Sequence, residues 1–162
     1  MNTNKNIDPQ TLILETLTQK AVVKQTVYKN TNATFKILKN VCKYVAQNTQ
    51  KSLKGLNTKI TSSYHESGHS QIELMVAGDL LVFSKHTNVF IFDKSHPIWK
   101  TSIVEQDNYS AYCGIINIYN FLADSFRYNR LEDAGYLIGR IFINQDMNFI
   151  VEGKRQLGVL YN

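Results

Sequence analysis

The longest segment without a helix-breaking residue is the feature that most constrains this sequence. No glycine or proline occurs between Pro9 and Gly55. Both boundary residues suit helix ends, because proline is favoured at the first helical position and glycine just beyond the last one. The segment predicts one or two helices over residues 11–54. A division into two is an alternative because Asn30, Thr31 and Asn32 are poor helix formers.

The predicted helix is amphipathic. At about 100° per residue, its apolar side chains gather on one side, namely Val23, Val27, Leu38, Val41, Cys42, Val45, Leu53 and Leu56. Lysines occupy the opposite side. Up to Tyr64, ten lysines against two acidic residues give a net charge of +8; beyond it, eight basic against eleven acidic residues give −3. The positive charge of the chain therefore belongs to its N-terminal part.

From residue 70 the apolar pattern acquires a period of two, which is typical of strands. Turn sequences at Gly78-Asp79 and at 86–88 divide this region into a predicted three-stranded meander over 70–92. A long connection over 93–111 follows. Apolar residues then recur at helical spacing and predict a helix over 112–126, with a strand there as the alternative. Residues 135–161 are predicted to form a hairpin.

These elements predict an α+β fold. A long N-terminal amphipathic helix, or two helices, packs on an antiparallel sheet of about five strands, with a second helix between the sheet halves. Residues 11–162 are expected to form a single domain. Residues 1–10 are polar and asparagine-rich and are expected to form a disordered tail.

A literal metalloprotease motif, H-E-x-x-H, occurs at His65, Glu66 and His69. On a helix, the two histidines would bind zinc and Glu66 would activate water. Here the motif contains Gly68 and runs into a strand pattern, which favours a polar loop instead. In an extended segment, residues four apart lie about 13 Å from each other, too far to share one zinc ion. Candidate third ligands are His86, Asp93, His96 and Glu105. No cofactor is expected, with zinc as the alternative.

The two cysteines, Cys42 and Cys113, lie in apolar patterns and are interpreted as buried thiols. No stretch approaches the roughly 20 apolar residues of a membrane span, and no signal-peptide pattern is present. A soluble protein of the reducing cytoplasm is therefore expected.

Two surfaces are candidate binding sites. The lysine side of the first helix suits nucleic acid through Lys36, Lys39, Lys43, Lys51 and Lys54. An aromatic and arginine-containing set suits a protein partner, because these residue types are enriched at interfaces. It comprises Trp99, Phe126, Arg127, Tyr128 and Arg130.

Residues from Gln71 to Tyr161, especially 76–92, 112–130 and 152–161, resemble a bacterial protein family of unknown function. That resemblance implies no activity or ligand. The expected order of elements is also similar to that of PAS, GAF and roadblock-type modules, which host many functions. The leading hypothesis is a non-enzymatic regulatory or protein-interaction module of the bacterial cytoplasm, binding a protein partner or forming a homodimer. A nucleic-acid-associated protein and a zinc-dependent hydrolase are the alternatives.

Overall fold

A computed structural model describes residues 8–55, 60–128, 130, 135–153 and 159–160. Its first element is a single unbroken helix, α1 (Pro9–Leu53). The asparagine-containing stretch does not split it, because tertiary contacts occupy those side chains. Asn30 donates hydrogen bonds to the carbonyl oxygens of residues 144 and 145, at 3.1 and 2.7 Å. Thr31 is buried and donates to the carbonyl of Val27, and Asn32 accepts from Lys85.

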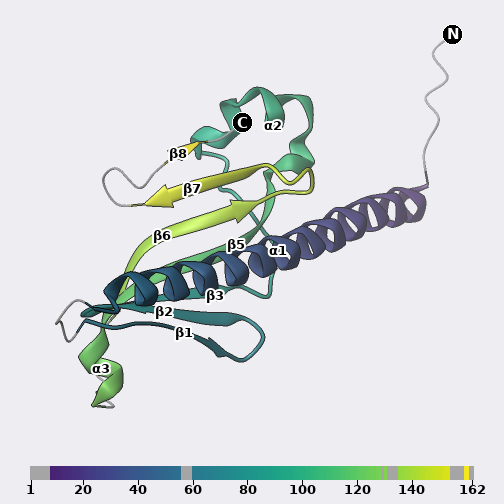
Figure 1. Ribbon diagram of the computed structural model, residues 1–162. Coiled ribbons are helices and arrows are strands. Elements are labelled where there is room, and N and C mark those ends of the chain that lie inside the picture. Colours follow the sequence, from purple (N-terminus) through teal and green to yellow (C-terminus); the bar gives the residue numbers. More distant parts are fainter. Residues whose placement is uncertain (1–7, 56–59, 129, 131–134, 154–158, 161–162) are drawn as a thin grey trace, which may run out of the picture.

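An antiparallel sheet lies behind α1 (Figure 1). Its strands pair in the order β1-β2-β3-β5-β6-β7-β8, and β4 pairs with one end of β5. The bounds are β1 (Ser62–Ser67), β2 (Gln71–Val76), β3 (Asp79–Lys85), β4 (Phe90–Ile91), β5 (Tyr112–Leu122), β6 (Tyr136–Ile143), β7 (Phe149–Gly153) and β8 (Val159–Leu160). The α+β class and the antiparallel sheet are confirmed. The described residues form eight strands, more than the five or so expected.

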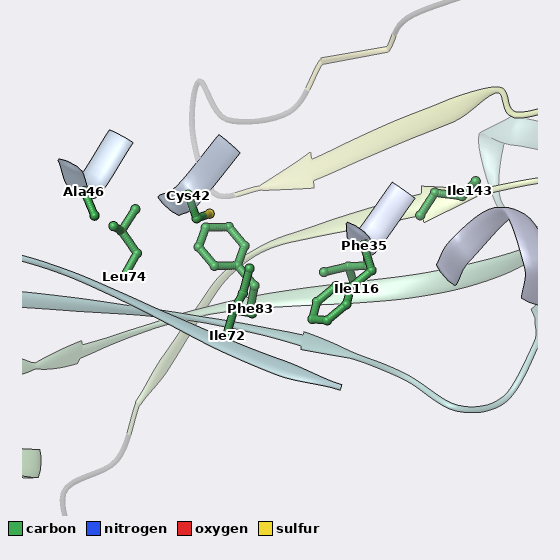
Figure 2. Packing of buried hydrophobic residues seen from close by; sticks show 8 residues of the cluster. All are labelled: Phe35, Cys42, Ala46, Ile72, Leu74, Phe83, Ile116 and Ile143. Atoms are coloured by element: carbon green, nitrogen blue, oxygen red, sulfur yellow. The ribbon is translucent and has the colours of Figure 1, made fainter. Parts of the chain in front are cut away.

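The main hydrophobic core lies between α1 and one face of the sheet. Figure 2 shows Phe35, Cys42 and Ala46 on α1 together with residues of the sheet. The sheet residues of this core are Ile72, Leu74, Phe83, Ile116 and Ile143. Buried positions on β2 alternate, as expected for a strand with one apolar face covered.

The connection between β4 and β5 folds into three short helices that cover the other face. They are η1 (Pro97–Lys100), α2 (Ser102–Gln106) and η2 (Asn108–Ala111). Ile98 and Val104 pack there with Phe92, Cys113 and Phe142 as a second core. The connection is therefore long because it forms part of the hydrophobic interior.

The helix predicted over 112–126 is wrong. Residues 112–122 form β5, the longest strand, and only the five residues of α3 (Ala123–Arg127) are helical. Ile116 on β5 packs in the core with α1, whereas Cys113 and Ile115 pack in the second core. Both faces are thus apolar, and the resulting spacing imitates a helix.

Three smaller predictions also change. The third strand of the predicted meander, β4, pairs with β5 and not with β3. The segment expected to be a polar loop forms the edge strand β1. Helix α1 begins at Pro9, within the expected tail; residues 1–7 lie outside the described residues.

Candidate functional site

The H-E-x-x-H residues lie on a strand and a turn. His65 and Glu66 belong to β1, and His69 lies in the turn that follows. Gly68 in that turn has a φ of 70°, in the left-handed region. Neighbouring strand residues point to opposite faces of a sheet, so His65 and Glu66 point away from each other. Residues 65–69 therefore lack the helical arrangement on which zinc hydrolysis by this motif depends.

Glu66 is held by two neighbours on the α1 side of the sheet. Its carboxylate lies 2.7 Å from the ammonium group of Lys39 and accepts a hydrogen bond of 2.9 Å from the Tyr64 hydroxyl. The hydrogen bond from Lys39, followed by that from Tyr64, holds the pKa of Glu66 below its usual value. Glu66 thus ties the edge strand to α1.

Two of the four candidate third ligands, Asp93 and His96, have other partners. Asp93 accepts hydrogen bonds from the backbone and side chain of Ser95, and His96 stacks on Phe92 and lies 2.9 Å from Glu152. In the part of the chain that the structure describes, no three His, Cys, Asp or Glu side chains are placed to hold one metal ion. The geometry gives the zinc hypothesis no support.

The five lysines proposed for nucleic acid differ in their surroundings on α1. Lys39 is paired with Glu66, and Lys36 is exposed elsewhere on α1. Lys43, Lys51 and Lys54 line a hollow between the last turns of α1 and strand β1, which we call the α1/β1 groove. Its volume is about 530 Å³, and its other lining residues are Ala46, Gln47, Gln50, Ser62, Ser63 and Tyr64.

Ser62 is the most unusual residue of the α1/β1 groove. Its backbone N–H donates a hydrogen bond of 2.8 Å to the Gln50 side chain, which fixes the start of β1 against α1. Its hydroxyl is buried and has no hydrogen-bond partner among the described residues. Such a group is rare in folded proteins, because leaving it unpaired costs free energy.

The first turns of α1 form a second notable surface. They extend past the edge of the sheet (Figure 1). The first buried residue of α1 is Val23, whereas Leu12, Ile13, Leu14 and Leu17 are each more than half exposed. We call Pro9–Thr18 the projecting end of α1. Contiguous exposed apolar side chains of this kind mark contact surfaces.

The predicted partner-binding residues are separated by the fold. Trp99 lies in η1, where its indole N–H donates to the carbonyl of Asp93 and the Lys94 ammonium group lies over its ring. Tyr128 and Arg130 follow α3, at the other end of β5. The eleven residues of β5 span about 36 Å. The side chains of Phe126 and Arg127 lie outside the described residues.

Sequence reasoning missed the groove residues Gln50 and Ser62. The sequence around Ser62 gives no local signal, because the position of this serine depends on how β1 packs against α1. The exposed leucines were visible as an apolar cluster, but the sequence did not reveal that the sheet ends before reaching them. Cys42 and Cys113 are buried, as predicted.

Comparison with models of known protein families, with characterised proteins and with solved structures gives no match to this chain. The family resemblance therefore stays an expectation. The analogy with PAS, GAF and roadblock-type modules depended on a helix between the sheet halves, and a strand occupies that position. None of the helices in the described residues has the length and apolar character that a membrane-spanning segment requires.

Proposed function

We propose that this chain is a non-enzymatic protein-interaction module that associates with a second copy of itself through the projecting end of α1. The observation that carries the proposal is the exposure of Leu12, Ile13, Leu14 and Leu17, which ranges from 54% to 64%. These side chains point to different sides of the helix. Exposed apolar side chains on neighbouring turns lower the free energy when a second molecule covers them.

The first turns of α1 project because the helix is longer than the sheet. A helix of 45 residues is about 68 Å long. Seven paired strands span only about 30 Å across the sheet, and the longest strand is about 36 Å long. Even along its diagonal, the sheet is too small to cover the whole helix. The uncovered apolar turns are thus available to another molecule.

The charges of the projecting region favour a second copy as that molecule. Glu15 is the only carboxylate of α1, and Lys20 follows five residues later. If two copies pair antiparallel about the bond between Leu17 and Thr18, Glu15 of each copy lies at the same level along the pair as Lys20 of the other, so opposite charges are matched in height. A two-fold pair of this kind uses the same surface twice and closes on itself.

Sedimentation equilibrium over a range of concentrations tests this proposal. We expect a dimer that the double variant Leu14→Asp/Leu17→Asp converts to a folded monomer, because both side chains are already exposed. Asn40→Asp is the matched control: it adds a negative charge at an exposed site on the half of α1 that the sheet covers, and it should leave the dimer intact.

A charge exchange tests the orientation. Glu15→Lys and Lys20→Glu should each weaken the dimer through like charges, and combining them in one chain should restore it. A wild-type protein that stays monomeric at high concentration would contradict the proposal.

A further inference from the structure

The α1/β1 groove lies at the opposite end of α1 from the projecting end. It combines three lysines, a buried unpaired hydroxyl and two glutamines in one hollow. We propose that the α1/β1 groove binds the phosphate group of an anionic ligand. This site is separate from the contact proposed above.

The charge balance of the groove favours an anion. Lys43, Lys51 and Lys54 all line it, and no acidic residue does. Glu66 on β1, outside the lining, is paired with Lys39 and also interacts electrostatically with Lys43. The C-terminal end of α1 contributes an opposing partial charge equivalent to about −0.5. Three ammonium groups outweigh that charge, so the net local field attracts anions.

The unpaired hydroxyl of Ser62 supplies a donor inside the groove. Ser62 is only 6% exposed, and its hydroxyl has no hydrogen-bond partner among the described residues. Its backbone N–H is held by Gln50, which fixes the position of the residue. A phosphate oxygen would accept a hydrogen bond from this hydroxyl and remove the cost of burying it unpaired. Tyr64 cannot take the role of a second free donor, since its hydroxyl already donates to Glu66.

The residue types point to phosphate and to no particular base. Lysine binds phosphate as a point charge, whereas the bidentate geometry of base and carboxylate recognition is typical of arginine. The volume of about 530 Å³ lies within the range of small-molecule sites and exceeds what a lone ion needs. A phosphorylated small molecule and the backbone of a single-stranded nucleic acid share this chemistry.

Isothermal titration calorimetry on the full chain tests the inference with three probes: inorganic phosphate, ribose 5-phosphate and a ten-residue oligothymidylate. The wild-type protein should bind at least one of them. Ser62→Ala should weaken binding about tenfold, as expected for a lost hydrogen bond to a charged group. The melting temperature of this variant should stay equal or rise, because a buried unpaired group has been removed.

The lysines are tested by matched double variants. Lys51→Ala/Lys54→Ala removes two charges from the groove and should weaken binding about tenfold or more. Lys29→Ala/Lys36→Ala removes two charges from the same helix outside the groove. This control should change the affinity less than about threefold. Tightest binding of ribose 5-phosphate identifies a small phosphorylated ligand. Tightest binding of the oligonucleotide, with steep salt dependence and the same losses, identifies a nucleic-acid backbone. Absence of binding by all three probes at millimolar concentration, or equal losses in the two double variants, would overturn the inference.

Discussion

Gly114 on β5 lies directly against Thr31 of α1. A β-carbon added at this glycine would lie 2.0 Å from the hydroxyl oxygen of Thr31 and 2.9 Å from its β-carbon. Thr31 cannot move aside easily, because it is buried and its hydroxyl donates to the carbonyl of Val27. The absence of a side chain at position 114 therefore sets the distance between helix and sheet.

We expect Gly114→Ala to lower the free energy of unfolding by about 1–3 kcal/mol, as is typical when an extra carbon is forced into a packed core. Chemical denaturation followed by circular dichroism measures the change. Gly78→Ala is the control, since a β-carbon there has nothing within 4 Å. Equal stabilities of the two variants would show that α1 does not pack as closely on β5 as described.

Glu66 makes the attachment of β1 sensitive to pH. Its pKa is lowered in the folded protein, so its stabilising contribution is present above the pKa of the unfolded chain and is lost as the pH falls through the folded value. Glu66→Gln should therefore be less stable than the wild type at pH 7, and the difference should shrink on acidification below about pH 4.

Denaturation at a series of pH values measures this difference, with Glu105→Gln as the control for loss of an exposed carboxylate. A difference between wild type and Glu66→Gln that persists unchanged at pH 2 would argue against the ion pair with Lys39.

At the scale of elements, the connection between β4 and β5 behaves as part of the second core. Val104 on α2 is 1% exposed and packs near Phe142 and Cys113. The neighbouring polar residues also fix the connection. The Asp107 carboxylate accepts a hydrogen bond of 2.6 Å from Gln145, and Ser110 bonds to Asp146 at 3.1 Å.

We expect Val104→Ala to destabilise the protein by about 2 kcal/mol, because two buried methyl groups are lost and the closely packed surroundings cannot fill the space. The fluorescence of Trp99, the single tryptophan, reports on the connection, and far-ultraviolet circular dichroism reports largely on α1. In the wild type both probes should give one transition. Ile91→Ala, at a 43% exposed site, should cost much less. A fluorescence transition well before the helix signal would mean that the connection unfolds separately.

At the scale of the whole molecule, the two cores share the sheet. Cys42 lies on α1, in the core between α1 and the sheet, and Cys113 lies in the second core. Burial raises the pKa of Cys42 to about 11 and that of Cys113 to about 12. Both thiols are therefore protonated and shielded in the folded protein at neutral pH.

We expect iodoacetamide at pH 8 to label the two cysteines at the same slow rate, because each becomes reactive only when the common sheet unfolds. Mass spectrometry of peptides containing Cys42 and Cys113 measures both rates. Rapid labelling of Cys42 alone would show that α1 detaches locally.

The raised pKa values also predict a pH dependence of stability. The free energy of unfolding should be constant up to about pH 9 and should fall as the pH rises towards 11, because the thiols of the unfolded chain ionise first.

Elements with local signals are predictable from the sequence. The absence of glycine and proline between Pro9 and Gly55 indicates α1. Period-two alternation indicates β2, and the apolar run after the turn at Gly78 indicates β3. The H-E-x-x-H segment was also judged correctly as non-helical, because Gly68 and the following strand pattern act within a few residues.

Other features depend on which elements cover a segment in the folded protein. Residues 112–122 are a strand because α1 covers one face and the connection covers the other, and a segment apolar on both faces has no distinctive period. The projecting end is exposed because the sheet is smaller than α1. The α1/β1 groove exists because β1 packs beside the last turns of α1. These outcomes arise from contacts between residues far apart in the chain, and no local pattern encodes them.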